Sequence, residues 1–485
     1  MTFNELVIDR KEWVKISQKN KFDFDSILAG LYNDPSHFIF ELLQNAEDEC
    51  ASEVKFELYN DRLDFYHNGE DFNIKDIESI TGIGISTKRD DLTAIGKFGL
   101  GFKSVFAITE SPIIHSGDFN IKIEDFVVPS MIEPVQLSYT LIRLPFNHST
   151  RKAQDVFDML SEKLRNVNLK SMLFLRNIRE IKWSTPIEEG HYLSESKVIE
   201  DNSKRVTIMS SDISENYVVF EKSIEIQGKE NKVEVAYRLG KDKDQNEIIL
   251  PVDDSNLIVF FPTEKETNLN FVIQGPYKTT PNRENIPFND PDNMKILNET
   301  GNLIADSLTF LKYLGYLDVN LLTLLPLKPN DTNIIYKNIY ECIKLKLQQD
   351  ELLPTYDNKF SNANSVILAR GEELPGFLSN EDIYVLFEKN YWLNTKITYD
   401  RTRDLRDYLI NELGIKEVDF GVFANKITKD FLSTKSDEWI VSFYDKLLNQ
   451  SSLWNEKGLL RRKTIIRLND DEHIEPFDNN GNIQV

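Results

Sequence analysis

The chain has 485 residues, which is too long for one ordinary core and predicts roughly three domains. Its net charge of −22, from 79 acidic and 57 basic residues, disfavours non-specific binding of nucleic acid. No run approaches the ~20 apolar residues that span a bilayer, and two cysteines exclude a disulfide framework, so we expect no membrane segment and a reducing, cytoplasmic compartment.

The first part of the chain, residues 1–170, mixes helical and strand patterns. Two short alternating segments are joined through Asn60-Asp61, which is typical of a β-hairpin. The expected elements are, in order, helices at 1–35 and 37–50, strands at 54–59 and 62–67, a glycine-rich stretch at 81–101, a helix at 102–108, strands near 121–128 and 137–144, and a helix at 151–166. This order predicts an α+β fold.

Two further regions follow. Residues 171–330 are rich in strand patterns and end in a helix near 297–315, whereas residues 331–485 alternate helices with short strands. We therefore expect three domains, at 1–170, 171–330 and 331–485. The pattern of a new strand begins at 483–485, directly after an Asn-Asn-Gly turn, which predicts that the natural protein continues.

Three polar side chains share one side of the predicted helix at 37–50. With about 100° between successive residues, Glu41, Asn45 and Asp48 lie within a narrow arc beside the apolar arc that packs into the core. A carboxylate there can take a proton from an attacking water, and an amide oxygen four residues on can hold Mg²⁺. The alternative is a solvated acidic helix face, and the helix alone does not decide between the two.

The second candidate is the glycine-rich segment that precedes the helix at 102–108. Gly96, Gly99 and Gly101 allow backbone N–H groups to wrap a phosphate at a helix N-terminus. The segment matches neither a Walker A loop nor a dinucleotide fingerprint, and a flexible loop is the alternative. The polar residues 81–95 before it have the composition of a mobile lid.

The order and spacing of these segments resemble the GHKL ATPases, a group named after DNA gyrase, the ninety-kilodalton heat-shock chaperone, histidine kinases and MutL. The segments HFIFELLQNAED, FYHNGEDF, GISTK and IGKFGLGFKSVF are most similar to sacsin-like members. The resemblance covers about residues 20–145. It implies an N-terminal GHKL (Bergerat) α/β sandwich that binds ATP and Mg²⁺.

The resemblance also implies roles for individual residues. Glu41 matches the general base and Asn45 matches the ligand of Mg²⁺, while Thr140 matches a threonine near the adenine. The nucleotide-binding positions implied by the matching motifs are Asn45, Asp48, His67, Asn68, Gly69, Asp71, Ser86, Thr87, Lys88, Gly96, Lys97, Phe98, Gly99, Leu100, Gly101, Phe102 and Thr140.

One position departs from the usual GHKL pattern. His67 stands where an aspartate normally accepts a hydrogen bond from the adenine amino group, and Asp71 stands where the second glycine of that motif is expected. Sacsin-like sequences share the His-Asn-Gly form. Either Asp71 or a backbone carbonyl could read the base, and His67 could equally be a turn residue.

A second signal lies in the middle region. Residues 274–284 follow a strand pattern and resemble the catalytic loop of the heat-shock chaperone's middle domain, in which an arginine reaches the terminal phosphate. A planar guanidinium suits charge on phosphoryl oxygens, which makes Arg283 the candidate and Lys278 the weaker second. The resemblance implies a strand-rich S5-like transducer domain here. An ordinary surface turn is the alternative.

These expectations favour a Mg²⁺-dependent ATPase that acts as a conformational switch, with the middle region docking through Arg283 and protomers forming a homodimer through the N-terminal domain. The resemblance implies a chaperone-like role on protein clients or a part in bacterial anti-phage defence, with the client or effector open. The alternatives are an ATP-sensing scaffold with little turnover, or a MutL-like DNA-processing ATPase, which the acidic composition disfavours.

Overall fold

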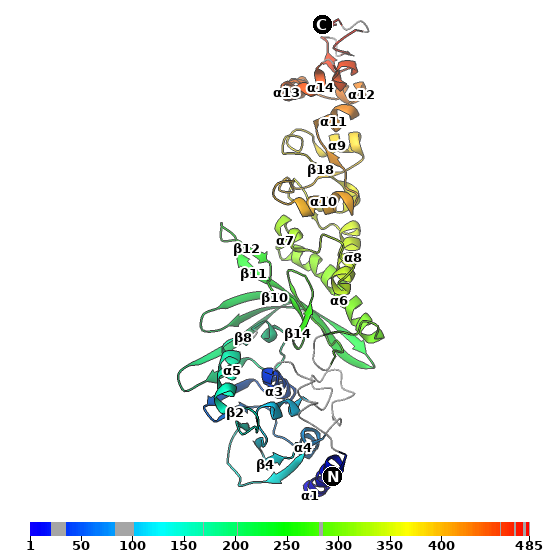
Figure 1. Cartoon of the computed structure of the whole chain (residues 1–485). Helices are drawn as coiled ribbons and strands as arrows, with labels where there is room; N and C mark the ends of the chain where they lie inside the picture. The colour runs from blue at the N-terminus through cyan, green and yellow to red at the C-terminus, as the bar shows by residue number, and fades with distance from the viewer. Residues whose placement is uncertain are drawn as a thin grey trace. The chain divides into compact units, whose positions relative to one another are not determined.

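A computed structural model gives the fold of the chain (Figure 1). The structure describes residues 1–20, 35–82, 101–167, 169–200, 202–280, 285–455, 457–469, 472–478 and 482–484. The chain divides into two compact units, Met1–Ile304 and Ala305–Val485. The expected boundary near residue 170 lies inside the first unit and the one near 330 inside the second, so the three-domain division stays a prediction.

The first unit contains helices and strands in the α+β arrangement that the sequence predicts. Its helices are α1 (Phe3–Lys19), α3 (Phe38–Asp48), α4 (Ile74–Thr81), α5 (Ala153–Arg165) and most of α6 (Pro291–Tyr313), with 3-10 helices η1 (Pro35–His37), η2 (Phe102–Ala107) and η3 (Leu169–Leu173). The predicted helices at 37–50 and 151–166 are thus confirmed as α3 and α5. The segment at 102–108 forms 3-10 turns in place of the expected α-helix.

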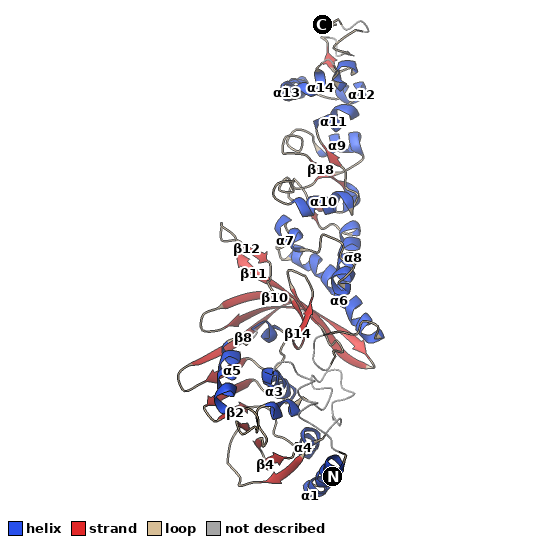
Figure 2. Ribbon diagram, in the orientation of Figure 1, coloured by secondary structure: helices blue, strands red, loops and turns tan. Residues whose placement is uncertain are grey.

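The strands of the first unit are β1 (Glu53–Tyr59), β2 (Arg62–His67), β3 (Ile113–Ser116), β4 (Phe119–Glu124), β5 (Val128–Met131), β6 (Thr140–Pro145), β7 (Glu180–Ser184), β8 (Glu189–Glu200), β9 (Ser203–Met209), β10 (Ser214–Ile226), β11 (Lys229–Lys241), β12 (Glu247–Leu250), β13 (Asn256–Val259), β14 (Phe261–Glu266) and β15 (Val272–Gln274). Within the described residues they form one mixed 15-stranded sheet (Figure 2). Its order is β14-β13-β15-β11-β10-β9-β8-β7-β1-β2-β6-β3-β4-β5, and β12 pairs with β11.

Strand β7 connects the two halves of this sheet. It runs parallel to β1, with Glu53 opposite Glu180, and antiparallel to β8, with Glu180 opposite Leu193. The helices α3 and α5 lie beside the half of the sheet that contains β1 and β2 (Figure 1). The backbone of the expected nucleotide region is therefore hydrogen-bonded directly to the strand-rich region that follows it.

The hairpin β1–β2 shows why this part of the chain folds as it does. The turn at Asn60-Asp61 sets the register, with Tyr59 opposite Arg62. Alternate residues of β1 are buried, which places the Phe56 ring 4.7 Å from that of Phe65 on β2. Such cross-strand aromatic pairs stabilise a sheet, and the alternation fixes which face meets the core.

The second unit joins helices to short strands, as expected for residues 331–485. Its helices are α7 (Val319–Leu324), α8 (Ile334–Gln349), α9 (Asn380–Phe387), α10 (Arg403–Asn411), α11 (Phe420–Lys426), α12 (Lys429–Ser433), α13 (Asp437–Leu448) and α14 (Ser451–Trp454), with 3-10 helices η4 (Ala363–Ser365) and η5 (Leu459–Arg462). Its strands are β16 (Leu353–Pro354), β17 (Phe360–Ser361), β18 (Val366–Ala369), β19 (Tyr391–Trp392), β20 (Glu417–Val418), β21 (Ile466–Arg467) and β22 (His473–Ile474).

An aromatic core stabilises the second unit. The ring of Phe377 stacks on that of Trp439 at 4.5 Å, and Phe423 and Phe443 lie in the same buried cluster. No described helix in either unit is both long and apolar enough to cross a bilayer.

Candidate nucleotide-binding site

Helix α3 carries the two residues on which the predicted chemistry depends. Its apolar residues Phe38, Ile39, Leu42 and Ala46 are fully buried, and they orient the helix against the core. Glu41 lies at the edge of that face and is 9% exposed, whereas Asn45, one turn later, is half-buried. Glu41 and Asn45 therefore lie on the rim of the core, as the helical spacing predicts.

The carboxylate of Glu41 lies against the end of the glycine-rich segment. A β-carbon built on Gly101 would lie 2.1 Å from Glu41 Oε2, far inside contact distance. The backbone of Gly101 has φ −56° and ψ −55°, an ordinary right-handed conformation. A larger residue at position 101 would therefore have to displace the Glu41 carboxylate, although the backbone conformation itself would accept it.

Two neighbours further define the surroundings of Glu41. His37, one turn earlier in the chain, places Nε2 3.5 Å from Glu41 Oε1. Gly101 leads into η2, where the Ser104 hydroxyl donates to the Gly101 carbonyl oxygen at 2.5 Å. Phe102, the first residue of η2, is 6% exposed and packs into the core. The residues that follow Gly101 in the chain therefore hold it beside Glu41, Ser104 through its hydrogen bond and Phe102 through its burial.

His67 lies at the opposite end of the candidate site, in the last position of β2. It is 2% exposed, and burial lowers the pKa of its imidazole to about 4. The backbone N–H of Gly69 donates to His67 Nδ1 at 3.3 Å, so the proton of the neutral ring lies on Nε2. Within the described part of the chain, Nε2 has no hydrogen-bond partner. His67 therefore presents a buried donor, where an aspartate would present an acceptor.

Thr140 is opposite His67 in the sheet. The two residues form a direct pair between β2 and β6, so their side chains project from the same face. Thr140 is fully buried, and its hydroxyl lies 2.5 Å from that of Ser116. Ser116 Oγ also accepts the Phe72 N–H at 2.9 Å. The structure thus brings together two residues, His67 and Thr140, that the resemblance assigns to the base.

Asn68 and Gly69 hold the end of β2 against the connection between α3 and β1. Asn68 Oδ1 accepts the N–H groups of Ser52 and Glu53 at 2.9 and 3.0 Å, and its Nδ2 donates to Ser52 Oγ at 2.9 Å. A β-carbon on Gly69 would lie 2.4 Å from the carbonyl oxygen of Glu49. The hydrogen bonds of Asn68 and the close approach of Gly69 to Glu49 explain why an asparagine and a glycine stand here. Contact of either residue with a nucleotide stays a prediction.

Of the remaining predicted site residues, the structure describes Asp48, Asp71 and Lys278. Asp48 is half-buried, and Asp71 is exposed and packs against Gly117, whose φ of +52° requires glycine. Lys278 is ion-paired with Asp290 at 2.9 Å and Asp292 at 2.7 Å. Several predicted residues lie outside the described part of the chain: Ser86, Thr87, Lys88, Gly96, Lys97, Phe98, Gly99, Leu100 and Arg283.

Sequence reasoning missed Glu47, the residue that bonds α3 to the segment directly before β7. Glu47 is 4% exposed, and Oε1 accepts the N–H groups of Arg176 and Asn177 at 2.6 and 2.9 Å. Its Oε2 accepts the Ile178 N–H at 2.9 Å. These bonds join residues about 130 positions apart, so no local pattern could indicate them.

Sequence reasoning also missed Lys103, in the first turn of η2. It is 2% exposed, and its ammonium group donates to the carbonyl oxygen of Phe126. Burial, with a smaller effect from the nearby Arg10, holds the pKa of Lys103 well below its usual range. A lysine between apolar residues in the segment FKSVF was the one sequence feature that could have indicated a buried lysine. Groups of three or more His, Cys, Asp and Glu that could hold a metal do not occur in the described ranges.

Comparison with known proteins gives a match within this part of the chain. Residues 63–135 match the Sacsin domain family. Human Sacsin is 36% identical over 114 residues, which are 20% of this chain and 2% of that protein. Protein NO VEIN of Arabidopsis thaliana is 24% identical over 311 residues, or 57% of this chain and 11% of that protein. The chain therefore spans a small part of either relative.

Two solved structures show distant likeness. The N-terminal domain of a DNA repair protein has a TM-score of 0.34 and 13% identity, covering 56% of this chain and 93% of that structure. The ATPase domain of the mismatch repair endonuclease MutL from Aquifex aeolicus has a TM-score of 0.25 and 11% identity, covering 49% and 86%.

Proposed function

Because the N-terminal part of the chain is sacsin-like and of the GHKL ATPase kind, we propose that it binds ATP with Mg²⁺ and hydrolyses it as a conformational switch. The observation that carries the proposal is the position of Glu41. A carboxylate that is 9% exposed and in contact with the end of the glycine-rich segment can act on a water beside a phosphate held there. On a solvated helix face, the carboxylate of Glu41 would be exposed and would not lie against Gly101.

The residues around Glu41 fit the groups that the proposal needs. Asn45 supplies an amide oxygen one turn from Glu41, and such oxygens suit Mg²⁺, which would neutralise charge on the phosphates. Glu41 would orient the attacking water and accept its proton. The N–H groups of the glycine-rich segment would hold phosphate oxygens, since successive backbone donors favour an anion.

At the other end of the site, His67 and Thr140 would contact the base. The buried Nε2–H of His67, which has no partner among the described residues, requires an acceptor, and an adenine ring presents one at N1. The Thr140 hydroxyl adds a second polar group on the same face. This arrangement supports base recognition through a histidine donor in place of an aspartate acceptor.

A second candidate function rests on that same histidine. An ATP-sensing scaffold with little turnover would need the base contact and no general base. The intact Glu41 and Asn45 favour hydrolysis over this alternative. Action on a protein client, a part in anti-phage defence, dimerisation and docking of Arg283 complete the proposal, and each is carried by the sequence resemblance alone.

Phosphate release and ATP binding, measured side by side, test the proposal. In the Glu41→Gln variant we expect ATP binding to persist and hydrolysis to fall about 10²–10⁴-fold, the usual contribution of a general base. Glu162→Gln, which alters an exposed glutamate on α5, is the matched control and should hydrolyse ATP normally. Unchanged hydrolysis in Glu41→Gln would remove Glu41 from the mechanism, and a native chain that binds ATP without turnover would favour the scaffold.

A further inference from the structure

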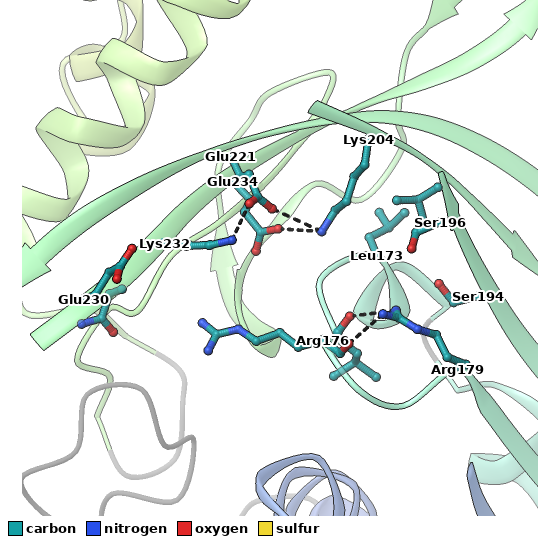
Figure 3. A pocket seen from close by; sticks show the side chains of 13 residues that line it. Leu173, Arg176, Arg179, Ser194, Ser196, Lys204, Glu221, Glu230, Lys232 and Glu234 are labelled. Carbon is teal, nitrogen blue, oxygen red and sulfur yellow. Dashed lines mark hydrogen bonds and ion pairs between the residues drawn. The ribbon is translucent and has the colours of Figure 1, made fainter. Parts of the chain in front are cut away.

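A cavity lies in the strand-rich half of the first unit, and neither Glu41 nor His67 lines it. It has a volume of about 490 Å³, is partly open to solvent, and lies between the segment 173–179 and strands β8 to β11 (Figure 3). This volume lies within the range of sites that bind small molecules. Neither the predicted nucleotide residues nor the matched Sacsin segment contributes to its lining.

The sheet supplies one wall, which is a network of charged side chains. Lys204 Nζ lies 3.5 Å from Glu221 and 3.3 Å from Glu234, and Lys232 pairs with Glu221. Gln274 donates to Glu234 at 3.1 Å. Glu234 is 4% exposed, and burial raises the pKa of its carboxyl group. The two lysines are thus already paired, and this wall does not by itself need a ligand.

The segment 173–179 supplies the opposite wall with two guanidinium groups (Figure 3). Arg179 donates to the carbonyl oxygens of Leu175 and Arg176, at 3.4 and 2.7 Å, which fixes its orientation. The Arg176 side chain is exposed and has no ion pair within the described ranges; its guanidinium carbon lies 5.9 Å from the centre of the Phe260 ring. Arg176 is therefore a cation without a counter-charge at the edge of a polar cavity.

Asn231 adds an independent sign that a ligand belongs there. It lines the cavity and is 2% exposed, yet its Oδ1 has no hydrogen-bond partner in the part of the chain that the structure describes. A buried acceptor without a donor costs free energy unless something supplies one. The lining carries four cationic side chains against three carboxylates: Arg176, Arg179, Lys204 and Lys232 against Glu221, Glu230 and Glu234. The lining thus has one more basic than acidic side chain, in a chain whose net charge is −22.

We propose that the cavity binds a small polar molecule that presents a phosphate or carboxylate to Arg176 and Arg179 and a hydroxyl or ammonium donor to Asn231. A guanidinium group can donate two parallel, charge-assisted hydrogen bonds to two oxygens of either anion. A wholly apolar ligand would leave the Asn231 oxygen unpaired and would cover the Arg176 guanidinium without supplying an acceptor.

The same segment gives the cavity a route to the proposed nucleotide site. The N–H groups of residues 176–178 are held by Glu47, which lies on α3 two turns after Glu41. If a ligand draws Arg176 inward, the backbone to which Glu47 is bonded would move with it. The cavity would then be an effector site that acts on α3 through these hydrogen bonds. This second step rests on the proposed function, whereas binding does not.

Calorimetric titration of the full chain without nucleotide tests binding. The probes are glycerol phosphate, glycerate and glycerol, which share hydroxyl donors and differ in the anion. We expect one of the two anions to bind at one site per chain and glycerol not to bind. In the Arg176→Gln/Arg179→Gln variant, affinity should fall about tenfold or more, as expected from loss of charge-assisted hydrogen bonds. Arg151→Gln, at an exposed arginine outside the cavity, is the matched control.

The single variant Arg176→Gln keeps the hydrogen bonds of Arg179. It replaces the double variant in the binding test if a thermal melt shows that the double variant is unfolded. Binding of glycerol phosphate identifies the anion as a phosphate, and binding of glycerate as a carboxylate. Absence of binding by both anions, equal binding of glycerol, or unchanged affinity in the arginine variants would overturn the proposal. Because no nucleotide is present, these outcomes are independent of whether the chain hydrolyses ATP. The effector step is tested separately, by whether the bound anion changes the rate of phosphate release.

Discussion

The carboxylate of Glu41 and the α-carbon of Gly101 are so close that no β-carbon fits between them: a β-carbon at position 101 would lie only 2.1 Å from Glu41 Oε2. Sixty positions separate the two residues in the chain. Their contact joins the helix that carries the proposed base to the end of the proposed phosphate segment.

This contact predicts the effect of Gly101→Ala. The backbone at Gly101 already has a right-handed conformation, so alanine adds no backbone strain, but its methyl group must displace the Glu41 carboxylate. We expect ATP hydrolysis to fall about tenfold or more, since a base displaced by about 1 Å loses its alignment. ATP affinity should change less. Phosphate release and nucleotide titration measure the two effects.

A double-mutant cycle shows whether Gly101→Ala acts through Glu41. In a Glu41→Ala background the carboxylate is gone, and the added methyl group meets no obstacle. Gly101→Ala should then cause little further loss of activity. Equal losses in both backgrounds would contradict a mechanism that operates through the carboxylate.

The lowered pKa of His67 predicts that the stability of the folded chain depends on pH. Its pKa is about 4 in the folded chain and about 6.5 when exposed, because burial disfavours the charged ring. The unfolded chain therefore binds more protons between these values, and stability falls as the pH drops from about 6.5 to about 4. The loss is on the order of 3 kcal/mol, since one pKa unit corresponds to about 1.4 kcal/mol.

Denaturant unfolding over this pH range measures the effect. In His67→Gln the titrating group is absent, and the slope of stability against pH should be shallower. His191→Gln removes an exposed histidine on β8 and should leave the slope unchanged. The same slope in native protein and His67→Gln would show that His67 is not the group that responds.

The hydrogen-bond polarity of His67 also predicts base preference. The native site offers a donor at Nε2, so a purine with an acceptor at its six-position, such as guanine, should compete with adenine. His67→Asp replaces the donor with an acceptor for an amino group. We expect the ratio of ATP to GTP affinity to rise about tenfold, the effect of one well-placed hydrogen bond. Competition against a fluorescent nucleotide measures the ratio, and an unchanged ratio would place His67 away from the base.

The hydrogen bonds of Glu47 predict that its replacement lowers the stability of the fold. Glu47→Ala removes the acceptor of three backbone N–H groups at residues 176–178 and leaves them without that partner. We expect the free energy of unfolding to fall by about 2–4 kcal/mol, since hydrogen bonds to a buried charged group are among the stronger ones. Glu47→Gln keeps one oxygen acceptor and should lose less. Chemical denaturation distinguishes these outcomes from the negligible change that an exposed side chain would give.

Much of the site could be predicted because its signals are local. The spacing of Glu41 and Asn45 fixes their common position on α3, and the turn at Asn60-Asp61 fixes the hairpin that ends at His67. Strand β8 has no local pattern that predicts it, because its second half is exposed and places Val198 next to Ile199 among polar residues, without a hydrophobic alternation. The helix expected at 102–108 became 3-10 turns, in which Ser104 bonds the carbonyl oxygen of Gly101.

By itself, the sequence determined the α+β class, the position of the helix and hairpin, and the likeness to sacsin, because periodicity and motif spacing are properties of neighbouring residues. Only the tertiary structure decided that Glu41 contacts Gly101, that His67 is a buried donor, that Glu47 holds residues 176–178, and that a cationic cavity faces strands β8 to β11. These features depend on which distant segments pack together, and burial then sets the charge and hydrogen bonding of each side chain.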